Sequence, residues 1–372
     1  MVETLRRKFA FLAVAAFGAV LPGLAAGPYY LSSSATNVDG PFTDATKWVD
    51  GEGQSAESFD PEADYVVKSG LVLRSFNSTW DHRTFGGKSL SIGDGTSEGT
   101  MYHYAAAKLT ESYTDIAGIY FNQLVLSKGT ITTQSGTDRV FNIFGPVKVV
   151  GDSNYVKASY AGADIRFRGK LSDNGSESDR IRFQGSNPVV ARFMDVTSDF
   201  GGILRVETAG SILDLSGTQM SVYADMLKGT TIRVDRPTQI RRVNFQAKES
   251  PDAPCVLQIG GVGRVPGSLK VTTTFQSSSF NNTSPYSCSL PISLVLEKSF
   301  KMPVGADRVV VLTVPAQSST LAINTDMLNK TFALDASAMR YPEDYSLAMD
   351  ADTNYKRIYV CKKKRGFVML LK

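Results

Sequence analysis

Residues 164–169, DIRFRG, and residues 180–185, RIRFQG, carry the pattern that decides the fold. In each run two apolar residues are separated by an arginine, and a glycine follows shortly after. Because alternate side chains of a β-strand point to opposite faces, each run places its apolar residues on one face and its arginines on the other. The two runs therefore predict short strands with one buried face, each followed by a turn.

Pairs of alternating apolar residues recur along most of the chain, and no segment after the N-terminal leader shows a sustained helical period. From Leu124 onward, short strands at intervals of roughly 16 to 28 residues predict the coils of an all-β solenoid. We expect its inward-facing ladder to include Ile165, Ile181, Leu204 and Ile232. The pairs are Leu90 and Ile92, Leu124 and Leu126, Val147 and Val149, Ile165 and Phe167, Ile181 and Phe183, Leu204 and Val206, Ile232 and Val234, and Leu257 and Ile259.

An antiparallel β-sandwich is the alternative fold. Its strands would follow one another about every 8–12 residues, joined by tight hairpins. Leu213 stands nine residues after Leu204, which fits this shorter spacing. The longer intervals between the other pairs favour the solenoid.

The N-terminal segment up to Gly27 has the three-part layout of a secretory signal peptide. Residues 6–8 (RRK) are basic, residues 9–21 carry no charge, and small residues occupy positions 25–27 after a Pro-Gly pair. We predict that residues 1–26 are cleaved, so that the mature chain is secreted or bound at the cell surface and has no transmembrane domain. A retained anchor is the alternative, because the uncharged run from Phe9 to Ala26 is near the lower length limit for a membrane span.

The composition limits the classes of partner. Hydrophobic residues make up 42% and charged residues 20% of the 372 residues, which is enough for a buried core. Cleavage after residue 26 removes three basic residues and one acidic residue, and leaves 37 basic against 35 acidic residues. This near-neutral balance gives no reason to expect nucleic acid as a partner.

Cysteine and histidine are scarce. The three cysteines, Cys255, Cys288 and Cys361, are too few for a disulfide scaffold. The two histidines, His82 and His103, are 21 positions apart, and no C-x-x-C motif accompanies them. We therefore predict no metal site and no cofactor. A bridge between Cys255 and Cys288 stays an open question, because it requires Cα atoms within about 7 Å.

The two ends of the chain differ from its middle. Residues 27–80 are rich in turns and aromatic residues, which suits a cap over the first open coil. Near the other end, residues 345–350 (YSLAMD) and 357–364 (RIYVCKKK) predict two closing antiparallel strands. We divide the chain into a signal peptide (1–26), an N-terminal cap region (27–80), a β-solenoid (81–290) and a C-terminal β subdomain or cap (291–372). The aromatic residues of the cap region are Tyr29, Tyr30, Phe42, Trp48, Phe59, Tyr65 and Trp80.

Three stretches share a pattern with one protein family. In residues 42–70 a tryptophan and a glycine precede Pro-x-x-Asp and a strand, residues 84–95 read TFGGKSLSIGDG, and in residues 197–217 a glycine-containing turn leads into a strand. The pattern resembles bacterial secreted proteins with autotransporter-associated β-strand repeats. The matching residues are Trp48, Gly51, Pro61, Asp64, Tyr65, Val66 and Val67, then Phe85, Gly86, Gly87, Leu90, Ile92 and Gly93, and finally Ser198, Phe200 and Gly201.

The resemblance covers roughly residues 40 to 360 and implies a right-handed parallel β-helix. It also implies secretion and an adhesin-like role at the cell surface, as for autotransporter passengers. One departure is the C-terminal CKKKRGFVMLLK, which lacks the transmembrane barrel of autotransporters, since a barrel needs several amphipathic strands of about ten residues. We therefore expect release of the chain, or anchoring by a partner.

Acidic residues bear on an enzymatic function, because parallel β-helices include polysaccharide lyases and hydrolases. Asp173, Glu177 and Asp179 lie in one loop, and Asp195 and Asp199 flank a later turn. Paired carboxylates can hold calcium or act as acid and base across a glycosidic bond. The same residues are also typical of a solvated turn, and they do not come from successive strands. We therefore predict no catalytic residues, and a carbohydrate-active enzyme is the alternative function.

Outward-facing arginines on the predicted strands form a basic stripe. Guanidinium groups bind carboxylates and phosphates, so the stripe is a candidate site for acidic glycans. Charged residues on strands also discourage edge-to-edge pairing, which is the structural explanation for them. The sequence thus predicts an exported, non-catalytic structural or adhesin-like protein whose partners are acidic glycans or other surface polymers. The candidate glycan-binding residues are Arg166, Arg168, Arg180, Arg182, Arg205 and Arg233.

Overall fold

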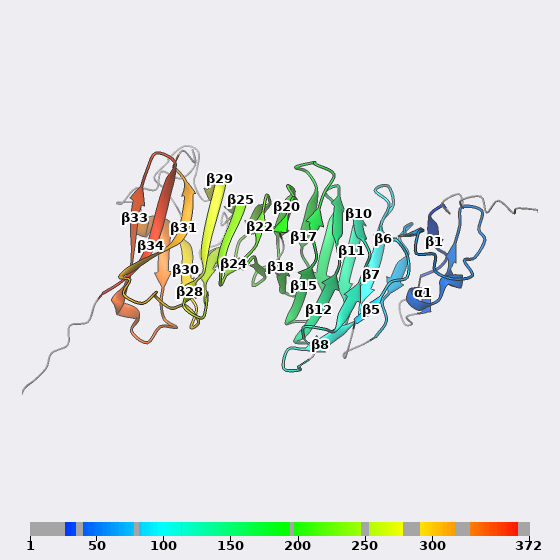
Figure 1. Cartoon of the computed structure of the whole chain (residues 1–372), viewed down its shortest axis with the longest axis horizontal. Coiled ribbons are helices and arrows are strands. Elements are labelled where there is room, and N and C mark those ends of the chain that lie inside the picture. Colours follow the sequence, from blue (N-terminus) through cyan, green and yellow to red (C-terminus); the bar gives the residue numbers. More distant parts are fainter. Residues whose placement is uncertain are drawn as a thin grey trace, which may run out of the picture.

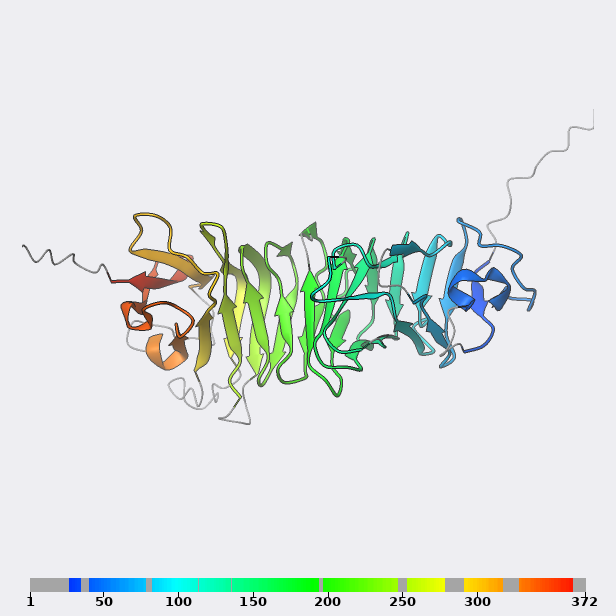
Figure 2. The ribbon, with the colours of Figure 1, turned by 90° about the horizontal axis from the view of Figure 1, so that it is seen from below.

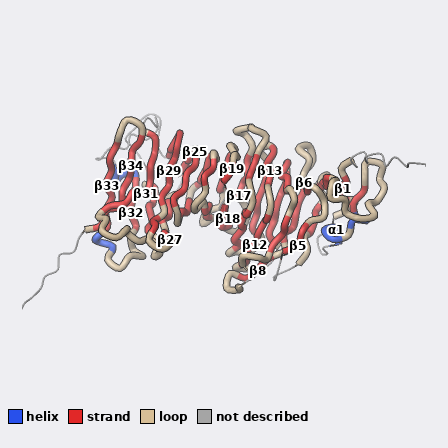
Figure 3. The backbone as a smooth tube through the Cα atoms, viewed as in Figure 1, coloured by secondary structure: helices blue, strands red, loops and turns tan. Residues whose placement is uncertain are grey.

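The computed structural model describes residues 27–34, 40–77, 82–112, 114–134, 136–193, 197–246, 253–277, 291–316 and 328–363. They form an elongated molecule whose strands lie side by side along its long axis, with the N-terminal strands at one end and the C-terminal strands at the other (Figure 1 and Figure 2). Strands dominate the described residues (Figure 3). The helices among them are short: α1 (Gly40–Thr43), α2 (Leu328–Thr331), η1 (Ala45–Lys47) and η2 (Pro342–Asp344).

Three long sheets, here named A, B and C, contain most of the strands. Sheet A has the order β2 (Trp48–Val49), β1 (Tyr29–Leu31), β3 (Asp64–Val67), β6 (Ser89–Ile92), β10 (Leu124–Ser127), β13 (Val147–Val150) and β16 (Leu171–Ser172). Sheet B has the order β4 (Val72–Arg74), β7 (Gly99–His103), β11 (Gly129–Thr133), β14 (Asn154–Ala158), β17 (Arg180–Phe183), β20 (Ile203–Val206), β23 (Tyr223–Leu227), β25 (Pro237–Gln246), β29 (Ser268–Ser277), β31 (Arg308–Pro315), β34 (Tyr355–Lys362) and β33 (Tyr345–Ala351). Two short strands, β19 (Thr197–Ser198) and β22 (Gln219–Met220), join sheet B through β25.

Sheet C has the order β5 (His82–Thr84), β9 (Gly118–Tyr120), β12 (Arg139–Phe144), β15 (Ala163–Arg168), β18 (Val189–Phe193), β21 (Ile212–Asp214), β24 (Thr231–Val234), β26 (Val256–Ile259), β30 (Ile292–Leu296) and β32 (Phe332–Asp335). One further strand, β8 (Ala106–Lys108), pairs antiparallel with β12. A separate hairpin consists of β27 (Gly261–Val262) and β28 (Val265–Pro266).

The chain visits the three sheets in rotation. After β10 in sheet A it enters sheet B at β11 and sheet C at β12, and the next turn repeats this order with β13, β14 and β15. Strands of successive turns pair in parallel, as β10 does with β13 and β12 with β15. The predicted all-β fold with parallel strands is therefore confirmed, and this pairing does not fit the alternative antiparallel sandwich.

The inward-facing residues form stacked rows, in which each residue lies beside its counterpart in the next turn. One row of sheet B contains Ile131, Val156, Phe183, Val206, Met226 and Phe245. All eight pairs of alternating apolar residues predicted from the sequence are buried, as are Ile165, Ile181, Leu204 and Ile232 of the expected ladder. Consecutive pairs often lie on different sheets, for example Val147 on β13 and Ile165 on β15, which is why their spacing in the sequence was irregular.

Polar side chains connect successive turns at the corner between sheets A and B. Asn154 is buried; its Oδ1 accepts a hydrogen bond from the N–H of Gly129, and its Nδ2 donates to the carbonyl oxygens of Val150 and Gly151. One turn later, the carboxylate of buried Asp179 accepts from the N–H of Gly151 at 2.6 Å. Each side chain thus satisfies backbone groups that a corner would otherwise leave without partners.

Aromatic residues fill the N-terminal end of the core. The rings of Trp48 and Tyr65 are 5.2 Å apart, and both pack against Phe85. Phe42 and Phe59 contact Phe85 from other directions. The parallel sheets already begin with β3 and β4 in this region, so the aromatic cluster and the first turns form one continuous core.

The C-terminal end closes with antiparallel strands. As expected from residues 345–350 and 357–364, β33 pairs antiparallel with β34, and β34 pairs antiparallel with β31. Sheet C continues in parallel to β32.

Some predicted features lie outside the described residues: the signal peptide (1–26), Trp80, Asp195 and Cys288. Within the described ranges, no helix is long and apolar enough to span a membrane.

Candidate functional site

The structure divides the six predicted arginines between two sheets. Arg166 and Arg168 are on β15 and Arg233 is on β24, all in sheet C. Arg180 and Arg182 are on β17, and Arg205 is on β20, in sheet B. The predicted single stripe is therefore two separate groups, each on the outward side of its sheet.

In sheet C the arginines belong to a ladder of ion pairs across neighbouring turns. Arg192 on β18 lies between Asp164 and Asp214, with its Nε 2.9 Å from Asp164 Oδ1. Arg233 pairs with Asp214 and, through its Nε at 2.9 Å, with Glu297. Both aspartates are buried, and each contacts two arginines: Asp164 contacts Arg166 and Arg192, and Asp214 contacts Arg192 and Arg233. Pairing of this kind compensates for the cost of burying the two carboxylates.

The ladder keeps the guanidinium group of Arg192 charged. Burial alone would lower the pKa of Arg192, but Asp164 and Asp214 together raise it above its usual value. The ladder residues Arg192, Asp214 and Arg233 occupy one row of paired positions on β18, β21 and β24. Their charges are thus satisfied within the protein, which indicates a structural role.

Arg166 and Arg168 both bind the segment between β8 and β9. Asp115 in that segment lies 3.0 Å from Arg166 Nη1 and 2.7 Å from Arg168 Nη2. Arg168 Nε also donates to Asn142 Oδ1 at 2.7 Å, and Asn142 Nδ2 donates to the carbonyl oxygens of Thr114 and Ala117. These two arginines therefore attach a surface segment to the outer side of sheet C.

The outward side of sheet B has a different balance of charge. Arg205 contacts Glu207 and Asp225 at 2.8 Å each, and Arg182 is 3.5 Å from Glu207. Arg241 and Arg242 on β25 share the exposed carboxylate of Glu177, at 2.6 and 3.6 Å. The group thus has five arginines and three carboxylates, and we call it the sheet B arginine face: Arg180, Arg182, Arg205, Arg241 and Arg242 with Glu177, Glu207 and Asp225.

A small polar pocket lies beside this face. It has a volume of about 300 Å³ and is lined by Tyr223, Arg242, Val243, Thr274 and Gln276. Tyr223, Arg242 and Thr274 occupy paired positions on β23, β25 and β29. Burial and the neighbouring charge of Asp225 raise the pKa of Tyr223, so its hydroxyl stays protonated. The pocket therefore offers hydroxyl, amide and guanidinium donors to an oxygen-rich ligand.

The sequence did not identify Arg241 and Arg242 as part of this group. They follow Ile240 directly and therefore do not alternate with apolar residues on both sides. The register of β25 shifts between Ile240 and Arg242, and this irregularity brings both guanidinium groups to Glu177. The signal available in the sequence was the pair of adjacent basic residues between Ile240 and Val243.

The acidic residues considered for catalysis have structural contacts. Asp173 accepts hydrogen bonds from the N–H groups of Gly175 and Gly201, at 2.7 and 2.6 Å. Asp179 is buried at the corner between sheets A and B, where it accepts a hydrogen bond from the N–H of Gly151. Glu177 pairs with Arg241. In the portions of the chain that the structure describes, no three histidine, cysteine, aspartate or glutamate residues are grouped to hold a metal ion.

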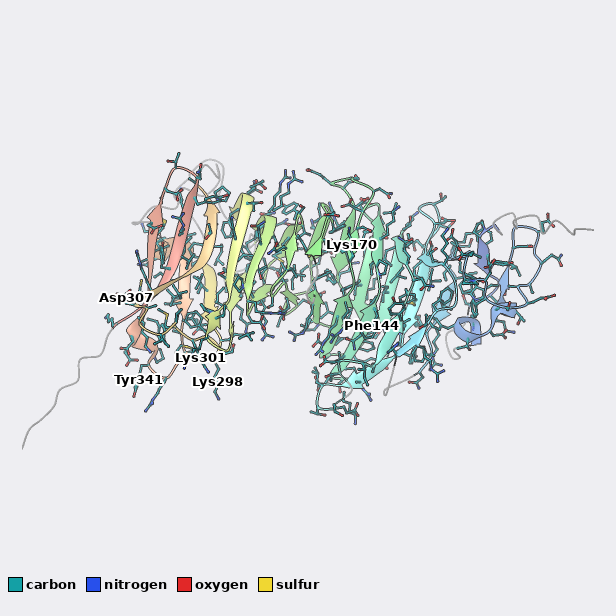
Figure 4. The ribbon with its side chains drawn as sticks, in the orientation of Figure 1. Phe144, Lys170, Lys298, Lys301, Asp307 and Tyr341 are labelled. Carbon is teal, nitrogen blue, oxygen red and sulfur yellow. The ribbon has the colours of Figure 1, made fainter. Side chains whose placement is uncertain are left out.

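Asp199 pairs with Lys170, which is labelled in Figure 4, at a distance of 2.9 Å on the surface. The hydrogen bond and charge of Lys170 lower the pKa of Asp199. The carboxylate is therefore charged at neutral pH and engaged in a surface ion pair.

Cys255 and His103 are both buried in the interior of the molecule. Burial raises the pKa of the free Cys255 thiol to about 12, so it is not a nucleophile at neutral pH. His103 Nε2 donates to the carbonyl oxygen of Asn142 at 3.1 Å, and burial lowers the pKa of His103 to about 4. Neither residue has the exposure that a reactive group requires.

No model of a known protein family matches this chain, and no curated protein sequence matches it either.

Proposed function

We propose that the chain is an exported, non-catalytic protein of the cell surface or extracellular space, built as a right-handed parallel β-helix with capped ends. The observation that carries the architecture is the rotation of the chain through three parallel sheets along one long axis. Right-handedness follows from the general rule that crossovers between parallel strands are right-handed. Such a body presents a long, regular wall, which suits a structural or adhesin-like role.

The resemblance to secreted proteins with autotransporter-associated repeats supports this proposal. The aromatic residues on which the resemblance rests lie in the core. Trp48, Tyr65 and Phe85 pack together in the first turns, and Phe200 is buried. The resemblance likens these segments to the entry segment, the first coils and the recurring repeat of such proteins.

The sheet B arginine face is the proposed binding surface, and acidic glycans or similar acidic surface polymers are the proposed partners. Its excess of arginine over carboxylate attracts anionic groups, and the adjacent pocket of about 300 Å³ supplies neutral donors. The arginines of sheet C are a weaker candidate because buried aspartates neutralise them. The carboxylates that an enzyme would need are held in turns and ion pairs, which favours binding over the alternative of a carbohydrate-active enzyme.

Substitution of the arginines tests the binding surface. We expect Arg182→Ala and Arg242→Ala each to weaken binding of the mature chain to polygalacturonate by about tenfold, which corresponds to about 1.4 kcal/mol. Arg264→Ala is the matched control, because it removes the same charge from the exposed loop between β27 and β28. Equal affinities for all four proteins, measured by titration calorimetry, would exclude this face as the binding surface.

Export is tested separately by the N-terminus of the mature protein. Mass spectrometry of protein taken from the medium or cell surface is expected to find a terminus between Ala26 and Pro28. An intact Met1 on protein that only detergent extracts would instead indicate a retained membrane anchor.

A further inference from the structure

The three most exposed large apolar side chains in the described part of the chain belong to two neighbouring surface tips. Val262 and Val265 are 51% and 53% exposed, and Val304 is 80% exposed. Val262 pairs with Val265 across the hairpin of β27 and β28, so the two flank its tip. Val304 stands in a tight turn, in which the N–H of Ala306 donates to the carbonyl oxygen of Pro303 at 3.1 Å. Apolar side chains exposed together in this way mark a contact surface.

Both tips lie on connections that run from sheet C to sheet B. Residues 260–267 lead from β26 to β29, and residues 297–307 lead from β30 to β31. Because β26 is parallel to β30 and β29 is parallel to β31, the two connections lie at the same end of these strands. The connections also contact each other, since the N–H of Gly261 donates to Ser299 Oγ at 3.3 Å. The tips therefore share one edge of the molecule, where Figure 1 labels β28.

Basic side chains accompany the valines on these connections. Arg264 occupies the end of the hairpin, and Lys298 and Lys301 lie on the other connection, as labelled in Figure 4. All three are exposed, and none has an ion pair with another described residue. Glu297 on the same connection belongs to the sheet C ladder of ion pairs, and Asp307 is the other acidic residue there. The edge thus has three unpaired basic side chains against one acidic side chain.

This combination suits the surface of a membrane that contains anionic lipids. At such a surface, apolar side chains enter the boundary between headgroups and acyl chains, and lysine and arginine are attracted to the acidic headgroups. A soluble polyanion would contact the basic side chains but would leave the valines in water. The valines and the basic residues together therefore favour lipid as the partner of this edge.

We propose that this edge attaches the chain to the surface of a membrane with anionic lipids. The three valines enter the headgroup region, and the three basic residues bind the acidic headgroups. The attachment is peripheral, because only the tips of two connections enter the lipid. It does not depend on the proposed binding of acidic polymers by the sheet B arginine face. We call this surface the valine edge: Val262, Arg264, Val265, Lys298, Lys301 and Val304.

Sedimentation of the mature chain with lipid vesicles tests this proposal. Vesicles of phosphatidylcholine with about 30% phosphatidylglycerol are the probe, and we expect them to bind at least about tenfold more strongly than vesicles of phosphatidylcholine alone. The double substitution of Val262→Ser and Val265→Ser should weaken binding to the anionic vesicles about tenfold, and Val304→Ser should weaken it severalfold. Leu109→Ser with Ile116→Ser is the matched control, because these two apolar residues are similarly exposed in the segment between β8 and β9.

The charges are tested with a second pair of variants. Lys298→Gln with Lys301→Gln should weaken binding to the anionic vesicles about tenfold and should leave binding to neutral vesicles unchanged. Lys88→Gln with Lys108→Gln removes the same charge from exposed positions elsewhere and is the control. Urea unfolding shows whether each variant keeps the stability of the parent chain.

Four outcomes would overturn the proposal. The first is absence of binding to the anionic vesicles. The second is binding that the lysine variant loses and the valine variants keep, because it would show adsorption by charge alone. The third is binding that all these variants keep and that deletion of residues 364–372 abolishes, which would assign attachment to the C-terminal residues. The fourth is vesicle binding that Arg242→Ala abolishes and the valine variants keep, which would place the contact on the sheet B arginine face.

Discussion

At the scale of single residues, His103 gives a direct link between burial and pH. The imidazole is fully buried, its Nε2 donates to Asn142, and its Nδ1 finds no hydrogen-bond partner among the described residues. Burial lowers the pKa of His103 from 6.5 to about 4, because a charged ring would lose its hydration. Between pH 6.5 and 4 the imidazole is therefore neutral in the folded protein and protonated in the unfolded chain.

This difference predicts how stability depends on pH. Above pH 6.5 the histidine is neutral in both states, so its contribution to the free energy of unfolding is fully present. As the pH falls from 6.5 towards 4, we expect the free energy of unfolding to drop by up to about 3 kcal/mol, at about 1.4 kcal/mol per unit of pKa difference. Urea unfolding at pH 7.5, 6, 5 and 4 measures this decrease in the free energy of unfolding.

His103→Gln is the control for this prediction, since glutamine can donate the same hydrogen bond and does not titrate. The variant should lose most of the pH dependence between 6.5 and 4. An equally steep decline in the variant would assign the effect to other groups.

At the scale of strands, stability depends on the inward rows. Leu204 on β20 is fully buried and lies between Ile181 and Ala224 of the neighbouring turns. We expect Leu204→Ala to lower the free energy of unfolding by about 2–5 kcal/mol, because the neighbouring turns cannot fully close the cavity. Ile203→Ala is the comparison: Ile203 is the adjacent residue on the outward side and is only half-buried. Equal losses for both variants in urea unfolding would contradict the inward row.

The alternation of apolar residues was sufficient to predict these strands and their buried sides. Leu204 and Ile232 could be assigned to the core because a strand has only two faces. The pattern could not show which of three sheets each strand joins, because that depends on where the chain bends between strands. Ile165 and Ile181, which begin consecutive pairs in the sequence, belong to sheets C and B.

The candidate site was only partly predictable for a related reason. The sequence shows that Arg166 and Arg182 point outward, but their neutralisation depends on carboxylates in other turns of the chain, such as Asp115 and Glu207. Arg192 also alternates with apolar residues, on β18, and it belongs to the ladder of buried aspartates. The sequence could not separate the two groups of arginines, because it does not show which residues of neighbouring turns lie side by side.

At the scale of the whole molecule, the stacked turns place chemically different surfaces on different sides of one body. The sheet C ladder satisfies its own charges, whereas the sheet B arginine face has more arginine than carboxylate. A repetitive wall with one such side can contact a long polymer at several points, and several weak contacts add up to stable attachment. The proposed function thus follows from the combination of an extended fold and one charged side.

The measurement that tests this account most directly is a titration of the mature chain with polygalacturonate in which the reducing ends are counted in the same sample. We predict binding that weakens at least several-fold between about 50 and 300 mM salt, because exposed charges are screened, and no increase in reducing ends over hours. Absence of binding at low salt, or a steady increase in reducing ends that Asp173→Ala abolishes in a folded variant, would contradict the account and favour an enzyme.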